Sequence, residues 1–241
     1  MKVVVAGAGI AGLALARGLL RAGHDVQVYE ESPEPRTAGG SVTLWPGSGG
    51  ILAGLGLGRL GWRLETMESW ARDGRRLLAV DLTAAERRYG HPTVHVARGE
   101  LVEALAEGVP VTYGARVERV AAHRAEALLA DGGRVRGDVL VGADGRRSAV
   151  RAALWGGDPA RLTGWVTWQG FVTCPTPLTG GRSAVLIPGG RGLCGLIPAG
   201  GRQAAVVVRR QVGARPPAVG GRPRPGGRAA GAVRRLARAG A

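Results

Sequence analysis

The pattern of apolar and polar residues begins with two short β-branched runs separated by a helical segment. Residues 3–6 form a continuous apolar run, which is typical of a strand buried on both faces of a parallel sheet. The segment after it predicts a helix that ends near Ala22, because Gly23 follows and glycine commonly terminates helices. A second strand is expected over residues 26–30. The start of the chain therefore predicts a strand–helix–strand unit.

The rest of the pattern predicts further strands and two more helices. A helix is expected over residues 98–108, with Leu101, Ala104 and Leu105 on one face, and another is expected to begin near Ser148. The Asp131-Gly132-Gly133 turn signal predicts a hairpin between residues 127–130 and 134–136. Other strands are expected at residues 41–44, 77–82, 111–113, 117–120 and 138–142. Residues 165–174, 183–187, 193–197 and 204–208 predict antiparallel strands, so the fold class is α/β with an added antiparallel sheet.

Charge and composition change sharply toward the C-terminus. Residues 1–150 contain 19 Lys or Arg against 17 Asp or Glu, whereas residues 151–241 contain 14 against 1. Residues 212–241 use only Ala, Gly, Arg, Pro, Val and Leu, which offers little to a packed core and predicts a low-complexity, largely disordered tail. The codons of these six amino acids are the richest in G and C. We therefore hypothesise that the tail is GC-rich DNA read out of frame, and translation of the other two frames would test this.

The cysteines and the apolar segments indicate a cytoplasmic protein. Cys174 and Cys194 show neither metal-like nor redox spacing, and we expect two free thiols rather than a disulfide. The apolar run after Lys2 resembles a secretory signal, but regularly spaced glycines interrupt it and a second strand follows. No segment reaches the roughly 18 to 20 apolar residues of a membrane span, so no contact with a membrane is expected.

Two binding functions are disfavoured by the local sequence. His91 and His95 are four residues apart, but Pro92 and the β-branched residues between them argue against a helix that could present both to a metal ion. No metal site is therefore expected. The arginine-rich tail lacks aromatic residues for base stacking, so no nucleic-acid partner is expected.

The glycine motif of residues 7–12 carries the chemistry of a dinucleotide site. Gly7 allows a tight turn out of the strand, Gly9 lets a pyrophosphate approach the backbone, and Gly12 lets the helix pack closely on the sheet. Ile10 and Ala11 lie in the first turn of the helix, whose free amides and partial positive charge favour phosphate. The alternative interpretation is a glycine-rich packing turn.

Glu30 ends the second predicted strand, 23 residues after Gly7. An acid at this place accepts hydrogen bonds from a ribose diol in dinucleotide-binding folds. The alternative is a solvated acid at a strand end. The order of strand, glycine turn, helix, strand and acid favours the ribose contact.

Three segments together resemble the FAD-dependent aromatic hydroxylases, the group A flavoprotein monooxygenases. They are residues 3–30, the helix start at residues 98–101 (RGEL) and residues 140–148 (LVGADGRRS). Residues 44–46 are similar to a family stretch near the flavin, with Gly47 in place of the usual asparagine. The resemblance covers about residues 1–211. It implies FAD binding, with NADH or NADPH as a transient reductant, by the following residues: Gly7, Gly9, Gly12 and Glu30 at the ADP moiety, Arg98 at phosphate or ribityl oxygens, Asp144 at FAD with a further role toward the nicotinamide cofactor, and Ile10, Ala11 and Gly145 as other cofactor-binding residues.

The resemblance also implies a domain organisation and an activity. A discontinuous Rossmann-like FAD-binding domain is expected over residues 1–70 and 95–157, and a partial substrate sheet over residues 71–94 and 158–211. The implied activity is hydroxylation of an aromatic or polyketide-like small molecule with O2. Since the cofactor carries this chemistry, no catalytic side chain is expected.

The family's second flavin motif has no counterpart in this chain. That motif is a Gly-Asp pair followed by Ala-Ala-His, and neither Asp138 nor Asp158 has this sequel. The helix and final sheet strands that follow it in the family are also missing, which predicts truncation or a frameshift after about Val208. Two alternatives to a hydroxylase stay open: a non-catalytic truncated homologue that binds nucleotide weakly, and a flavin or nicotinamide reductase without oxygen transfer. The sequence does not determine the oligomeric state.

Overall fold

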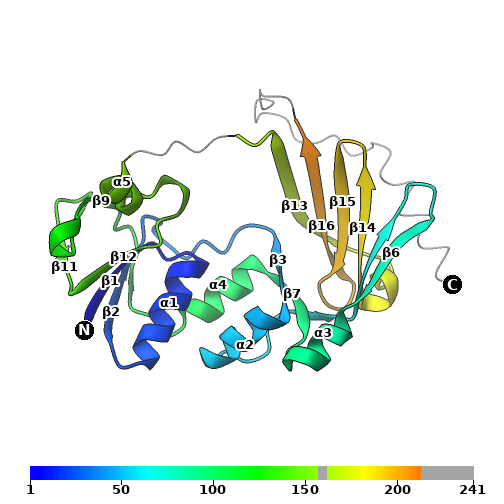
Figure 1. The fold of residues 1–241 in the computed structure, drawn as a ribbon, viewed down its shortest axis with the longest axis horizontal. Helices are drawn as coiled ribbons and strands as arrows, with labels where there is room; N and C mark the ends of the chain where they lie inside the picture. Colours follow the sequence, from blue (N-terminus) through cyan, green and yellow to red (C-terminus); the bar gives the residue numbers. More distant parts are fainter. Residues whose placement is uncertain (157–161, 213–241) are drawn as a thin grey trace. The chain divides into compact units, whose positions relative to one another are not determined.

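The computed structural model describes residues 1–156 and 162–212, and these form two compact units. Figure 1 shows their helices and strands. Unit 1 holds residues 1–38, 52–58 and 98–156, and unit 2 holds residues 39–51, 59–97 and 162–212. Residues 39–51 and 59–70 were expected in the first domain, but they belong to unit 2 because their strands pair there. The expected tail lies outside the described residues, except for Val212.

A four-stranded parallel sheet forms the centre of unit 1. Its strand order is β12-β1-β2-β8, with β1 at Lys2–Ala6, β2 at Asp25–Tyr29, β8 at Val111–Thr112 and β12 at Val139–Gly142. Val3, Val4 and Val5 are buried, because structure covers both faces of the sheet. Helix α1 (Ile10–Arg21) packs against β1 and β2, and against α4 (Arg98–Ala106). The predicted strand–helix–strand unit is confirmed.

A second layer of unit 1 consists of a small antiparallel sheet and a short helix. The sheet contains β9 (Val117–Ala121), β10 (Glu126–Leu129) and β11 (Arg134–Arg136), and the predicted hairpin joins the last two. Helix α5 (Ala149–Trp155) begins after Ser148, whose hydroxyl accepts a hydrogen bond from the Arg151 amide at 2.9 Å. A buried cluster that includes Ala6, Val117 and Val150 joins this layer to the parallel sheet.

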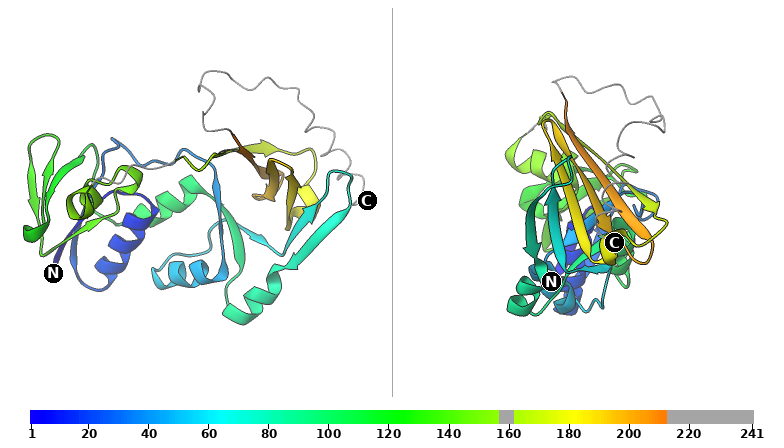
Figure 2. Two further views of the ribbon diagram at one scale, coloured as in Figure 1. Left: turned by 45° about the horizontal axis from the view of Figure 1, so that its top comes forward. Right: turned by 90° about the vertical axis from the view of Figure 1, so that its right-hand side faces the viewer.

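Unit 2 contains a six-stranded sheet in the order β13-β16-β15-β14-β5-β6. The predicted antiparallel pairing of its four C-terminal strands is confirmed, whereas the parallel pairing of β14 with β5 was not predicted. Figure 2 shows the hairpin of β5 and β6 in cyan. The strand bounds are Thr66–Trp70 for β5, Arg76–Asp81 for β6, Trp165–Thr173 for β13, Ser183–Gly189 for β14, Gly192–Pro198 for β15 and Gln203–Gln211 for β16.

A second sheet and two helices complete unit 2. The sheet has the order β3-β7-β4, with β3 at Ser41–Leu44, β4 at Trp62–Leu64 and β7 at Thr93–Ala97. The two helices are α3 (Leu82–Tyr89) and α2 (Pro46–Gly54), whose last three residues, 52–54, belong to unit 1. Neither was predicted, since α2 is rich in glycine and α3 has few apolar residues. Among the described residues, no helix combines the length and apolarity needed to cross a bilayer.

Buried polar side chains gather where β3 pairs with β7. The His95 ring is buried, and its Nδ1 lies 3.0 Å from the hydroxyl of Thr43, the residue directly opposite on β3. Burial disfavours the charged ring and lowers the pKa of His95 to about 4. His95 Nε2 and the hydroxyls of Ser41 and Thr93 are buried without a hydrogen-bond partner. Protonation of His95 is therefore expected to destabilise this part of unit 2.

Replacing Gly12 with alanine should destabilise unit 1 by about 1 to 3 kcal/mol. A Cβ at Gly12 would lie 2.0 Å from the carbonyl oxygen of Gly7, and a backbone atom cannot move away cheaply. The matched control is Gly54→Ala in α2, where a Cβ meets nothing within 4 Å. Urea unfolding should show a lower midpoint for Gly12→Ala alone, and equal midpoints for both variants would contradict the structure.

Acidification should destabilise the protein through His95 by up to about 3 kcal/mol. The folded pKa of about 4 is below the unfolded value of 6.5, so between these values the unfolded chain binds a proton that the folded chain does not. This contribution to stability is fully present above about pH 6.5 and is lost as the pH falls to about 4.

The measurement is the urea midpoint at several pH values for the wild type, His95→Gln and the control His123→Gln. His123 is exposed, so its variant should keep the wild-type pH dependence, whereas His95→Gln should flatten it. An unchanged slope in His95→Gln would show that another group is responsible.

Candidate functional site

Two glycine turns meet at the carboxyl ends of β1 and β12. These strands are parallel neighbours, so both chain segments leave the sheet at the same edge. Gly7 has a φ of +100°, and a Cβ there would lie 2.5 Å from the carbonyl oxygen of Ala143. The conformation and the close approach both require glycine at this position. The contact places residues 7–12 beside residues 143–145.

Gly9 and the first turn of α1 present an open backbone surface. Gly9 is the N-cap of α1, and no side chain caps this helix end. A Cβ at Gly9 would meet nothing within 4 Å, so the space in front of this residue is empty. Ile10 and Ala11 follow in the first helical turn, where amide groups have no partner within the helix. Such a surface attracts phosphate oxygens.

Asp144 lies in the turn after β12 with one carboxylate oxygen held and the other unpartnered. Its Oδ2 accepts hydrogen bonds from the amides of Ala149 at 2.6 Å and Val150 at 3.2 Å, at the start of α5. Its Oδ1 is buried and has no hydrogen-bond partner. Burying an oxygen of this kind is costly unless a ligand donates to it. Gly145, which follows, has a φ of +72° that favours glycine.

Glu30 follows β2 and is held by two backbone amides. Its Oε2 accepts from the Ala8 amide at 2.8 Å, and its Oε1 accepts from the Ser32 amide at 2.9 Å. The side chain of Arg36 approaches the same Oε1, with Nε at 3.5 Å. Glu30 is 8% exposed, so the alternative of a solvated acid at a strand end is wrong.

Arg98 begins α4 and fastens a loop that precedes β3. Its Nη1 donates to the carbonyl oxygens of Arg36 and Ala38. At the next residue, Gly99, a Cβ would lie 2.8 Å from the carbonyl oxygen of Thr37, so the loop passes close to the start of the helix. Arg98 therefore holds the loop of residues 36–38 in place, and it also brings positive charge to the site.

A cavity of about 270 Å³ in unit 1 brings most of the predicted residues together. The predicted residues on its wall are Gly7, Gly9, Glu30, Arg98, Asp144 and Gly145. Ile10, Ala11 and Gly12 do not line it. Gly12 serves the packing of α1 against the glycine turn instead, as its 2.0 Å approach to Gly7 shows.

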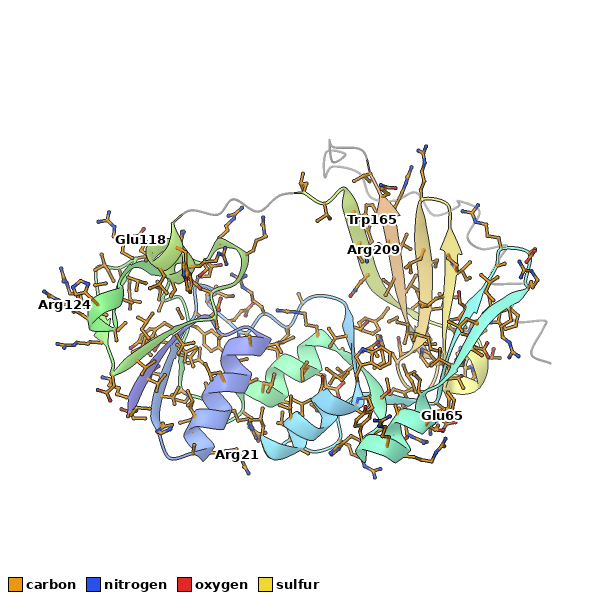
Figure 3. The ribbon with its side chains drawn as sticks, viewed as in Figure 1. Arg21, Glu65, Glu118, Arg124, Trp165 and Arg209 are labelled. Carbon is orange, nitrogen blue, oxygen red and sulfur yellow. The ribbon has the colours of Figure 1, made fainter. Side chains whose placement is uncertain are left out.

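The cavity also contains charged residues that the sequence did not single out. Arg36, Arg116, Glu118 and Arg147 lie on its wall, and Figure 3 labels Glu118. Arg36 and Arg116 also reach Glu31, at 2.7 Å and 3.9 Å. Glu31 itself also lines the cavity. Arg147 belongs to the segment of residues 140–148, whereas no motif marks Arg36, Arg116 or Glu118, because only the fold brings their segments to one place.

The two histidines considered as metal ligands have separate surroundings. The side chain of His91 lies against Gly49 and Gly50 of α2, whereas His95 contacts Thr43 on β3. In residues 1–156 and 162–212, no group of three or more His, Cys, Asp or Glu side chains is arranged to hold a metal ion. Cys174 and Cys194 are free thiols.

Comparison with known proteins identifies the family. The model of the family described as "FAD binding domain" matches residues 1–166. An FAD-dependent urate hydroxylase of Klebsiella pneumoniae is 32% identical over 198 residues, which is 75% of this chain and 50% of the relative. The 3-amino-4-hydroxybenzoate 2-monooxygenase PtnB3 of Streptomyces platensis is 37% identical over 183 residues, which is 71% of this chain and 46% of the relative.

Solved structures show the same fold. Klebsiella pneumoniae HpxO complexed with FAD and uric acid superimposes with a TM-score of 0.80 at 28% identity, covering 90% of this chain and 58% of that one. The chain spans about half the length of the curated relatives it matches. The resemblance drawn from the glycine and Asp-Gly motifs is confirmed: the chain belongs to the FAD binding domain family, and the relatives it matches are FAD-dependent hydroxylases and monooxygenases.

Proposed function

We propose that this chain binds FAD in the cavity of unit 1, as part of a monooxygenase that uses NADH or NADPH and O2 to hydroxylate a small aromatic molecule. The observation that carries this proposal is that Asp144, whose carboxylate has a buried, unpartnered Oδ1, lines the same cavity as the open backbone of Gly9. A ligand that donates a hydrogen bond to the carboxylate and brings phosphate to the helix end satisfies both features.

Each part of the cavity wall has a role in this proposal. The backbone at Gly7 and Gly9 holds the diphosphate, and the first turn of α1 at Ile10 and Ala11 contributes the partial positive charge of the helix end. Glu30 accepts hydrogen bonds from ribose hydroxyls, since the two amides that hold it leave lone pairs on both oxygens. Arg98 adds positive charge near the phosphates.

Asp144 and Gly145 take the flavin side of the cofactor. The two amides at the start of α5 fix the Asp144 carboxylate, so that its second oxygen keeps one orientation. When bound, FAD supplies hydride acceptance and oxygen activation, and the protein's task is to position it and to exclude water.

The substrates of the relatives support the substrate class. They act on urate, on 3-amino-4-hydroxybenzoate and, in Polaromonas naphthalenivorans, on 3-hydroxybenzoate. All three are small, electron-rich ring compounds. We place the reaction in the cytoplasm, where NADH and NADPH are available and free thiols such as Cys174 and Cys194 persist.

Titration of the full chain with FAD should show binding that Gly9→Val weakens at least about tenfold. The isopropyl group would occupy the empty space in front of Gly9. The matched control is Gly58→Val, which also meets nothing within 4 Å and lies away from the cavity. Flavin fluorescence and visible absorbance report the binding.

A second variant, Asp144→Asn, tests the role of the unpartnered carboxylate oxygen of Asp144. The amide oxygen can still accept from Ala149 and Val150, while the free oxygen becomes an N–H donor, so FAD should bind about tenfold more weakly with little change in the urea midpoint. Wild-type affinity in both Gly9→Val and Asp144→Asn would refute the site.

Turnover separates the proposal from its two alternatives. With FAD bound, NAD(P)H oxidation that depends on an aromatic substrate and places labelled oxygen in the product supports a monooxygenase. Oxidation without oxygen in the product identifies a reductase. Binding without any turnover identifies a non-catalytic homologue.

A further inference from the structure

The cavity of unit 1 extends past Glu30 to side chains that no motif accounts for. The Ala115 amide donates to the Glu30 carbonyl oxygen at 2.8 Å, so the chain that leads into β9 lies beside the end of β2. This contact brings Arg116 and Glu118 to the cavity that Glu30 also lines. Arg36 reaches the same cavity from the loop after β2. Two arginines and one acid therefore gather near Glu30 without a role in the strand–helix–strand unit.

Glu30 lies between the glycine turn and Arg36. Its Oε2 accepts from the Ala8 amide at 2.8 Å, whereas its Oε1 lies 3.5 Å from the Arg36 Nε. The further inference rests on the proposed function, in which Gly7 and Gly9 hold the diphosphate and Glu30 holds the ribose. In an ADP unit the base follows the ribose, so the base reaches the side chains on the far side of Glu30.

Glu31 ties the two arginines together through opposite oxygens of one carboxylate. Arg36 Nη2 lies 2.7 Å from Oε1, and Arg116 Nε lies 3.9 Å from Oε2. More than half of each arginine side chain is exposed. Within the described residues, no aromatic ring covers either guanidinium group. Their flat faces are therefore free to stack on a planar ligand, which guanidinium groups do readily.

Glu118 supplies a hydrogen-bond acceptor in the same cavity. It is the second residue of β9, and its side chain is exposed (Figure 3). Val117, directly before it, is buried in the cluster that joins β9 to the parallel sheet, which fixes the strand in place. In the part of the chain that the structure describes, no group donates a hydrogen bond to the Glu118 carboxylate. A carboxylate only accepts, so a ligand bound here meets it best with a donor.

We propose that Arg36, Arg116 and Glu118 recognise the adenine ring of FAD. The guanidinium faces of Arg36 and Arg116 stack on the ring, and the Glu118 carboxylate accepts a hydrogen bond from its exocyclic amino group. Glu31 acts through the two arginines and is a positioning residue. Cation–π attraction and a hydrogen bond to a charged acceptor both add affinity, so the base contributes binding energy that the diphosphate does not supply.

The alternative is that the two arginines only attract the negative diphosphate. In that case lysine would replace either of them at little cost, because it carries the same charge. Stacking needs the planar guanidinium group, which lysine lacks. The dependence of binding on the base therefore separates the two roles.

The first test compares ADP with ribose 5-diphosphate, which lacks the base, by isothermal titration calorimetry of the full chain. Arg36→Lys and Arg116→Lys should each weaken ADP binding at least about fivefold and leave the binding of ribose 5-diphosphate unchanged. The matched control is Arg119→Lys, since Arg119 is exposed on β9 and does not line the cavity. This control should bind both ligands like the wild type.

The second test compares ADP with purine riboside 5′-diphosphate, which lacks only the amino group. The wild type should prefer ADP about tenfold, and Glu118→Ala should bind the two ligands equally. The matched control is Glu103→Ala, an exposed acid of α4 that does not line the cavity, and it should keep the preference. Because Glu118 is exposed, its variant should have the urea midpoint of the wild type.

An FAD titration of the same samples distinguishes failure of this inference from failure of the proposed function. A wild type that binds FAD but does not distinguish ADP from purine riboside 5′-diphosphate would overturn the recognition of adenine and leave the FAD site standing. The same holds if both lysine variants bind ADP as tightly as the wild type. A wild type that binds neither FAD nor ADP would overturn both.

Discussion

The close packing of two glycine turns at the carboxyl ends of β1 and β12 is the constraint on which the candidate site depends. Gly7 approaches Ala143, and Gly12 approaches Gly7, at distances where no Cβ fits. This contact sets the position of α1, and it brings Asp144 to the cavity that Gly7 and Gly9 also line, although these residues are far apart in the sequence. A bulkier residue at any of these glycines would separate the helix end from the carboxylate.

Backbone amides fix the orientation of two carboxylates that line the cavity, those of Glu30 and Asp144. Glu30 is held by Ala8 and Ser32, and Asp144 is held by the first amides of α5. A carboxylate held in this way loses little further freedom when a ligand binds, so more of the interaction energy appears as affinity. Four arginines line the same cavity as four acids and offset their negative charge.

Unit 2 combines a buried histidine with a large sheet whose two edges differ in charge and in the regularity of their pairing. Its interior encloses His95 as a neutral ring with few polar partners, which links stability to pH. Its large sheet protects one edge with charge and irregular pairing, and leaves the other edge apolar and regular.

The sequence by itself determined the strand–helix–strand unit, the hairpin at Asp131, the helix after Ser148 and the four C-terminal strands, because each follows from local periodicity, turn residues or caps. It also determined the family, since the glycine and Asp-Gly motifs are local in sequence. Only the tertiary structure decided that residues 39–51 join unit 2, that β14 runs parallel to β5, and that α2 forms in a glycine-rich segment. It also decided that Arg36, Arg116 and Arg147 reach the cavity. These features depend on pairing and packing between segments distant in the chain, and no local pattern records which distant segment will become the neighbour.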